Sequence, residues 1–120
     1  MLVVDDDPII ASGLDQILTR KGFDVVSFTE SPKALEYLRN ETSEFDVLIA
    51  DRVMPEITGD VLVKECRSLR PSVPVVFCTG FVDDLPDDER RQIGADAYCL
   101  KPYDCDELGE LIARLLIAKR

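Results

Sequence analysis

The sequence predicts an α/β protein in which helices cover both faces of one parallel β-sheet. Short apolar segments rich in valine and isoleucine alternate along the chain with segments whose apolar residues recur at helical spacing. The apolar segments are mostly continuous and do not alternate with polar residues, which is typical of strands buried on both faces. Because the chain has 120 residues, we expect one domain, residues 1–120, built as a doubly wound (βα)5 unit.

Apolar segments of this kind are predicted to form the strands. Each is short and is followed by a polar residue, which marks the point where the buried strand ends. The predicted strands are residues 2–4, 25–28, 47–50, 73–78 and 97–100.

The segments between the strands carry signals for helix starts and ends. Pro8 and Pro32 suit the first turn of a helix, and Asp7 and Ser31 are placed to cap the N-termini of these helices. Gly22 follows two basic residues and predicts a helix end. The apolar stripes are Ile10, Leu14, Ile17 and Leu18 in the first helix, and Leu108, Leu111, Ile112 and Leu115 in the last.

Two further helix starts are predicted in the second half of the chain. Asp104 and Glu107 have the spacing of a capping box. Pro86 follows acidic residues and predicts the start of a short, acidic helix that ends at Gly94.

The composition argues against several classes of function. The formal net charge of -10 argues against nucleic acid or anionic lipid as a direct partner, because both require a basic surface. No apolar segment approaches the length of a membrane span and no export leader is present, so we expect a cytoplasmic protein without direct membrane contact. The chain has no histidine, which excludes Ser-His-Asp and Cys-His catalysis, histidine-ligated zinc and a phosphohistidine on this chain.

The four cysteines form no CxxC pair. Cys78 and Cys99 lie inside predicted strands, so we expect small buried apolar residues in a reducing compartment.

Polar residues that suit one kind of chemistry follow four of the predicted strands. Asp5 and Asp6 follow the first strand, Asp51 follows the third, Thr79 the fourth and Lys101 the fifth. The carboxyl ends of parallel strands meet at one edge of the sheet, where ligands bind in open α/β folds. Each residue alone is more often a cap, a turn residue or a solvated charge, but together they predict a functional site.

Carboxylates from different strands form an oxygen-rich pocket that suits Mg²⁺. We expect Asp5, Asp6 and Asp51 to surround the cation, which offsets the repulsion among their charges. A carboxylate can also attack phosphorus and form an aspartyl phosphate. Lys101 and Mg²⁺ would then neutralise the phosphoryl charge, and the Thr79 hydroxyl would donate to a phosphoryl oxygen.

Four motifs carry a resemblance to a known family. They are LVVDDDP, LIADRVMPEITG, PVVFCTG and GADAYCLKPY, in the family's order and at its spacing. The sequence resembles the receiver domain of two-component response regulators over essentially all 120 residues. This resemblance implies a flavodoxin-like fold with a five-stranded parallel sheet in the order 2-1-3-4-5, an order that the apolar pattern alone does not give.

The resemblance also implies a role for each site residue. Asp51 would be the phosphoacceptor, and Asp5 and Asp6 would be the acidic pair that holds Mg²⁺. Thr79 would be the switch hydroxyl, and Lys101 the lysine that contacts the phosphoryl group.

Further expectations from the resemblance concern three positions. Val53 would offer its backbone carbonyl to Mg²⁺, and Tyr98 would change rotamer on activation. The bond between Lys101 and Pro102 looks like one that the family holds in the cis form, which X-Pro bonds adopt at low cost.

Phosphorelay signal transduction is the function that the resemblance implies. A histidine kinase or phosphotransfer domain would donate the phosphoryl group, since this chain has no histidine, and the receiver would assist its own phosphorylation and dephosphorylation. A downstream protein or phosphorelay domain would bind the surface that phosphorylation changes. The motifs look most like receivers attached to hybrid sensor histidine kinases, so we expect a domain of a longer protein.

The sequence departs from the family's commonest pattern at three positions. Thr58 stands where many receivers have an aspartate, and we expect only an altered hydrogen bond in that loop. Val53 and Phe81 are apolar where some members carry polar groups. Our hypothesis is that they exclude the hydrolytic water and prolong the phosphorylated state.

Two alternatives remain open on the sequence. A haloacid-dehalogenase-like phosphatase would use Asp5 and Asp7 as its D-x-D motif, but it needs an acidic pair after Lys101 and leaves Asp51 without a role. A receiver-like module that is never phosphorylated would act only by binding proteins. The position of a trapped phosphoaspartate, or its absence, distinguishes these alternatives.

Overall fold

A parallel β-sheet lies at the centre of the computed structural model, which describes residues 1–40, 44–51, 54, 56–79, 96–100 and 105–118. The strand order is β2-β1-β3-β4-β5, and every pair of neighbouring strands is parallel. This confirms the predicted α/β class with a parallel sheet. The strands are β1 (Leu2–Val4), β2 (Val26–Phe28), β3 (Leu48–Asp51), β4 (Val75–Thr79) and β5 (Ala97–Leu100).

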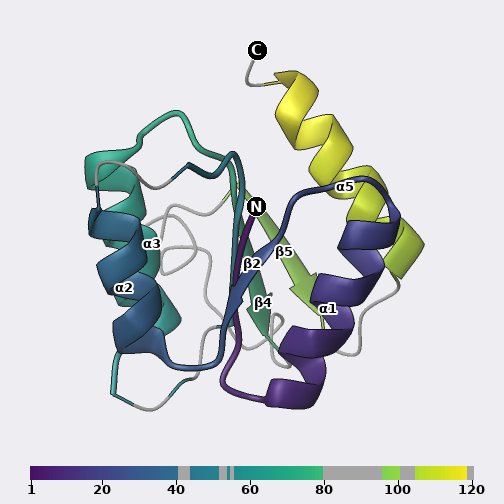
Figure 1. The fold of residues 1–120 in the computed structure, drawn as a ribbon. Coiled ribbons are helices and arrows are strands. Elements are labelled where there is room, and N and C mark those ends of the chain that lie inside the picture. Colours follow the sequence, from purple (N-terminus) through teal and green to yellow (C-terminus); the bar gives the residue numbers. More distant parts are fainter. Residues whose placement is uncertain (41–43, 52–53, 55, 80–95, 101–104, 119–120) are drawn as a thin grey trace.

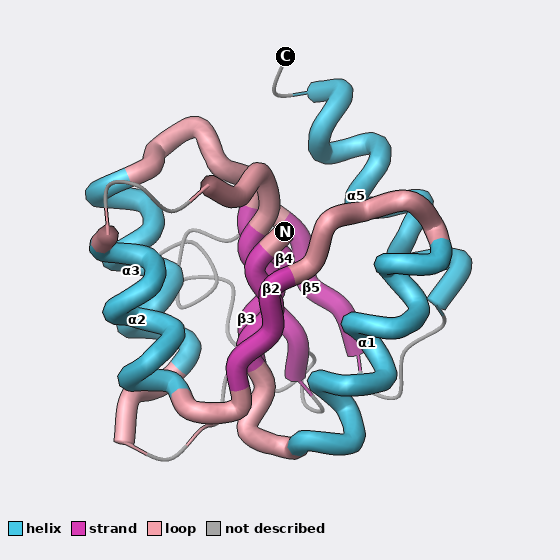
Figure 2. Tube along the Cα trace, viewed as in Figure 1, coloured by secondary structure: helices cyan, strands magenta, loops and turns pink. Residues whose placement is uncertain are grey.

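Helices cover both faces of the sheet (Figures 1 and 2). α2 (Ser31–Arg39) and α3 (Gly59–Leu69) lie side by side on one face, and α1 (Pro8–Arg20) and α5 (Cys105–Ala118) lie on the other. The helix predicted between Pro86 and Gly94 and the Asp104 cap lie outside the described residues, so the complete set of five βα units stays a prediction. In the part of the chain that the structure describes, no helix combines the length and the apolar character that crossing a bilayer requires.

Burial on both faces explains the continuous apolar segments. Successive side chains of a strand point to opposite faces, so each strand contributes to two core clusters. The cluster beneath α2 and α3 takes Leu2, Val4, Leu48, Ala50, Val75 and Phe77 from the sheet. The cluster beneath α1 and α5 takes Val3, Ile49, Val76 and Cys78.

Both predicted ends of α1 are confirmed. Asp7 is the N-cap residue, and its Oδ1 accepts a hydrogen bond from Ile9 N at 2.9 Å. At the other end, Gly22 adopts a φ of 96°. Gly22 N and Phe23 N donate to carbonyls of the last turn at 3.0 and 3.1 Å, a Schellman motif that requires this left-handed residue.

Ser31 does not cap α2, contrary to the prediction. The N-cap residue is Glu30, which makes no side-chain capping hydrogen bond, and Ser31 is the first residue of the helix, with Pro32 in the first turn as predicted. The Ser31 Oγ accepts a hydrogen bond from Ile57 N at 3.2 Å. The hydroxyl therefore forms a hydrogen bond with the loop after β3.

Strand register brings the ends of β1 and β3 to one edge of the sheet. Val4 pairs with Ala50, and Ala50 pairs with Phe77 of β4. Asp5 follows Val4, and Asp51 follows Ala50 as the last residue of β3. Because β1 and β3 are neighbours in the sheet, the two aspartates lie next to each other at its carboxyl edge.

Candidate functional site

Two buried aspartates form the centre of the site. Asp5 is 1% exposed and Asp51 is 8% exposed. Asp5 N donates to Phe28 O at 3.1 Å, which extends the β1–β2 ladder by one residue and fixes the backbone of Asp5. Asp51 pairs with Cys78 of β4, so its backbone is held within the sheet. Strand pairing thus positions both carboxylates before any ligand binds.

Asp6 adds a third carboxylate to this pair. One carboxylate oxygen from each of Asp5, Asp6 and Asp51 lies within 4.8 Å of the other two. Asp6 is exposed, so the cluster opens to solvent on its side. Negative charges at this separation repel one another, and burial strengthens the repulsion because the local dielectric falls. A hard divalent cation with oxygen ligands would offset that repulsion, so the donor set fits Mg²⁺.

Asp7, the last of the three consecutive aspartates, orients the first. Its side chain caps α1, as predicted, while its backbone N–H donates to Asp5 Oδ1 at 3.0 Å. This hydrogen bond restrains the Asp5 carboxylate, whose orientation decides which of its oxygens faces Asp51. Of the three neighbouring acids, Asp5 and Asp6 thus belong to the acidic cluster, and Asp7 caps α1 and orients Asp5.

The remaining predicted site residues are placed in part or not at all. Thr79 is the last residue of β4 and Tyr98 the second residue of β5, so both lie on strands of the same sheet. Their side chains, and all of Val53, Phe81 and Lys101 with the following X-Pro bond, lie outside the described residues. Their roles stay predictions.

Sequence reasoning missed the contacts that shape the loop after Asp51. Met54 is buried in the core cluster beneath α2 and α3, and the Ile57 side chain packs against the same cluster. Between them, Glu56 adopts a φ of 68°, and Ile57 N donates to Ser31 Oγ. No signal in the sequence separates this use of the hydroxyl from helix capping, because a serine before a proline suits both.

Cys78 is a buried free thiol, as predicted, whereas the side chain of Cys99 lies outside the described residues. Cys66, to which this prediction did not extend, is also a buried free thiol. Burial raises the pKa of the Cys66 thiol to about 11, so this group stays protonated near neutral pH.

Comparisons with known proteins agree with this arrangement. The family model for the response regulator receiver domain matches residues 1–113. The sensor kinase CckA of Brucella abortus is 28% identical over 119 residues, which are 97% of this chain and 12% of that protein. The transcriptional regulatory protein YrkP of Bacillus subtilis, described as uncharacterized, is 34% identical over 118 residues, which are 96% of this chain and 48% of that protein. The chain thus spans less than half the length of either relative.

A solved structure has the same fold over nearly its whole length. It is the response regulator protein TrrA of Thermotoga maritima in complex with Mg²⁺ and BeF. The two chains share 28% identity with a TM-score of 0.81, and the match covers 95% of this chain and 96% of that one. Because the family model covers residues 1–113 and the folds agree, this chain belongs to the response regulator receiver domain family.

Proposed function

We propose that the chain is a phosphorelay receiver that accepts a phosphoryl group on Asp51. The observation that carries this proposal is the convergence of Asp5, Asp6 and Asp51, since one carboxylate oxygen from each lies within 4.8 Å of the other two. Asp51 is buried at the end of β3, while Asp6 beside it is exposed, so a phosphodonor would reach Asp51 from the open side of the cluster. A carboxylate held in this way is suited to nucleophilic attack on phosphorus.

Asp5, Asp6 and Asp51 would hold Mg²⁺, with the backbone carbonyl of Val53 as a further ligand. The relative TrrA is a complex with Mg²⁺ and BeF, which supports this assignment. When bound, the cation supplies charge neutralisation for the phosphoryl oxygens. The Asp7 N–H that bonds Asp5 Oδ1 would keep one carboxylate of the cluster oriented throughout.

Thr79 and Lys101 would complete the site. β4 ends at Thr79, at the carboxyl edge where the acidic cluster lies, and Lys101 directly follows β5 in the sequence, which supports a place for it at the same edge. The threonine hydroxyl would donate to a phosphoryl oxygen, and the lysine ammonium would neutralise charge on the same group. Tyr98 would then change rotamer, and the surface of the last strand and the last helices would shift between two arrangements that partners distinguish.

The proposed reaction moves a phosphoryl group from nitrogen to oxygen. The P–N bond of a phosphohistidine on the donor breaks, a P–O bond to the Asp51 carboxylate forms, and the imidazole leaves. Water later attacks the acyl phosphate, which releases inorganic phosphate and restores the carboxylate. Because this chain has no histidine, a histidine kinase or phosphotransfer domain must supply the phosphohistidine.

The relatives suggest two kinds of parent protein. CckA is a sensor kinase, whereas YrkP is a transcriptional regulatory protein. We propose a hybrid histidine kinase in the cytoplasm, because the motifs around Asp51 and Lys101 look most like receivers of that class. A downstream protein or phosphorelay domain would then read the phosphorylated state.

Phosphorylation by acetyl phosphate tests the proposed function. The chain is incubated with acetyl phosphate and Mg²⁺, the phosphoaspartate is trapped by reduction, and its position is mapped by peptide mass spectrometry. We expect one modification, on Asp51, that is lost in Asp51→Asn and on removal of Mg²⁺ by EDTA. Asp24→Asn, at an exposed aspartate away from the cluster, is the matched control and should be labelled normally.

Two other outcomes would contradict the proposal. Modification of Asp5 would point to the phosphatase chemistry considered above. Absence of any modification, together with no binding of beryllofluoride, would favour a module that acts only by binding proteins.

A further inference from the structure

We infer that the groove between the C-terminal ends of α2 and α3 is a docking site for an acidic segment of a partner protein that also carries apolar side chains. The groove has a volume of about 310 Å³ and is lined by Leu38 and Arg39 of α2 and by Leu69 and Arg70 at the end of α3. None of these four residues is a predicted site residue, and the docking site does not depend on the proposed function.

The groove lies at the edge of the sheet opposite to the acidic cluster. α2 and α3 lie side by side (Figure 1), and each connects the carboxyl end of one strand to the amino end of the next. Their last residues, Arg39 and Leu69, are therefore both at the amino edge of the sheet. A protein held in this groove would leave Asp51 accessible to a phosphodonor.

The Arg70 guanidinium is the cation that the groove offers to a partner. Its Cζ lies 4.6 Å from the centroid of the buried Phe45 ring, and one terminal nitrogen donates to Asn40 O at 3.1 Å. Asn40 is the C-cap residue of α2, so this hydrogen bond ties Arg70 to the negative end of that helix dipole. These contacts orient the guanidinium and use only part of its five N–H donors.

The charge of Arg70 has no counter-ion within the described part of the chain. Its half-buried side chain pairs with no carboxylate there, although the chain has 24 acidic residues. The neighbouring Arg39 is neutralised by Glu65 at 2.7 Å. A guanidinium binds a carboxylate through two parallel N–H donors, and an arginine that is already oriented loses less conformational entropy when it does so. A carboxylate of another molecule would therefore complete the coordination of Arg70.

Leucine side chains give the groove its apolar part. Leu69 is 50% exposed next to Arg70, and the buried Leu38 also lines the groove. An apolar side chain of the partner would bury the exposed part of Leu69, which favours binding. Nucleic acid would supply negative charge without matching apolar side chains, and the net charge of -10 repels a polyanion. An acidic peptide segment with apolar side chains matches both parts of the groove.

Peptide titration tests this inference on the complete chain. The probe is the synthetic pentapeptide DLELD with blocked ends, and binding is followed by NMR chemical shifts of the backbone amides. We expect shift changes confined to residues around 38–40 and 69–70, with a dissociation constant on the order of 1 mM. The neutral peptide NLQLN should produce no comparable changes. Equal binding of the two peptides to the unchanged chain would overturn the inference, even if variants of Arg70 lose stability.

Three variants separate the contributions of charge and apolar contact. Arg70→Met should weaken binding of DLELD at least about tenfold, because a charged hydrogen-bond pair is lost. Leu69→Ala should weaken it about threefold to tenfold through lost apolar contact. Lys64→Met is the matched control, since it removes an exposed cation of α3 that does not line the groove, and its affinity should stay unchanged. Equal losses in Arg70→Met and Lys64→Met would overturn the inference, because they would show only general attraction between opposite charges.

Two further measurements test other occupants of the groove. Inorganic phosphate at the same ionic strength should not reproduce the shift changes. If it does, the groove binds small anions and the inference is wrong. Dilution of the chain without peptide should leave the shifts of residues 38–40 and 69–70 unchanged. Concentration-dependent shifts at these residues would assign the groove to a second copy of this chain and overturn the inference.

Discussion

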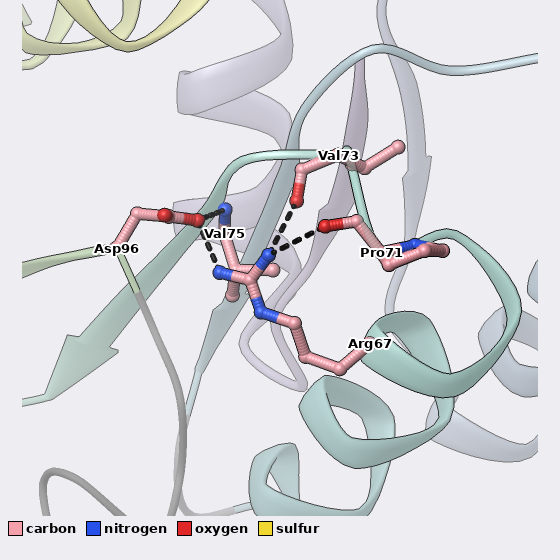
Figure 3. A network of polar contacts seen from close by, with 5 residues as sticks. All are labelled: Arg67, Pro71, Val73, Val75 and Asp96. Carbon is pink, nitrogen blue, oxygen red and sulfur yellow. Dashed lines mark hydrogen bonds and ion pairs between the residues drawn. The ribbon is translucent and has the colours of Figure 1, made fainter. Parts of the chain in front are cut away.

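The Arg67 guanidinium on α3 is paired with the Asp96 carboxylate directly before β5, and the same carboxylate oxygen accepts Val75 N at 2.8 Å (Figure 3). The other terminal nitrogen of Arg67 donates to Val73 O at 3.0 Å and to Pro71 O at 3.4 Å. One side chain thus joins α3, the loop after it and the amino ends of β4 and β5. This network lies at the edge of the sheet opposite to the aspartates.

Loss of this network should destabilise the fold. The side chains of Arg67 and Asp96 are only 25% and 19% exposed, so truncation leaves a poorly solvated carboxylate without its cation. We expect Arg67→Met to lower the free energy of unfolding by roughly 2 kcal/mol, measured by urea denaturation. Glu65→Gln, which breaks the more exposed Arg39–Glu65 pair, is the control and should shift the midpoint much less. Equal shifts in the two variants would contradict this prediction.

Alkaline pH should destabilise the fold through Cys66. Burial raises the pKa of this thiol from 9.0 to about 11, so the folded state favours the neutral form. The resulting stabilisation is fully present below the unfolded pKa and is lost as pH rises through the folded pKa. We expect about 1 to 3 kcal/mol to be lost between pH 9 and pH 11, measured by urea denaturation. Cys66→Ala should show a shallower decline, and an equally steep decline would exclude Cys66 as the cause.

We expect the Ile9 side chain to affect phosphoryl transfer from a phosphohistidine domain but not from acetyl phosphate. Its side chain is 82% exposed at the start of α1, two residues after Asp7. A protein donor that reaches Asp51 would cover this position and bury the side chain. Ile9→Ala should therefore slow transfer from a phosphohistidine domain about tenfold and leave labelling by acetyl phosphate unchanged.

Leu69→Ala is the control for this comparison, because Leu69 is also exposed but lies at the far end of α3. Transfer from the protein donor should be normal in that variant. A similar loss in both variants, or a loss with acetyl phosphate, would show that Ile9 does not act through donor contact.

Val53 should prolong the phosphorylated state. The hypothesis is that this apolar side chain and that of Phe81 would exclude the water that hydrolyses the acyl phosphate. Val53→Asn introduces a polar group that can orient this water, so we expect the half-life of phosphorylated Asp51 to fall severalfold. The half-life is measured as loss of radiolabel after the donor is removed, with Val61→Asn on α3 as the control. An unchanged half-life would count against the hypothesis.

The succession of strands and helices along the chain follows from the sequence, because buried positions require apolar side chains. Strands buried on both faces need continuous apolar residues, and α1 shows its ends through Asp7 and Gly22. The first and last residues of each strand are harder to predict, because an apolar side chain indicates burial and does not show whether its backbone pairs with a neighbouring strand. Val73, for example, was included in a predicted strand, but its amide donates to Arg70 O in a turn and β4 begins at Val75.

The acidic cluster was also predictable, because it depends on one topological rule. In a parallel sheet, residues that directly follow strands share an edge, so Asp5 and Asp51 converge once their strands are recognised as neighbours. The motif resemblance supplied that neighbour relation, which the apolar pattern does not contain.

Only the tertiary structure showed how Ser31 and Arg67 are used. Ser31 had a local partner available as a helix cap, and its choice of Ile57 depends on how closely the two βα junctions pack. Arg67 pairs with Asp96 across 29 residues, although many other carboxylates are present in a chain with 24 acidic residues. Sequence patterns specify which groups must be buried or exposed. The choice among several chemically equivalent partners depends on distances that exist only after the elements have packed.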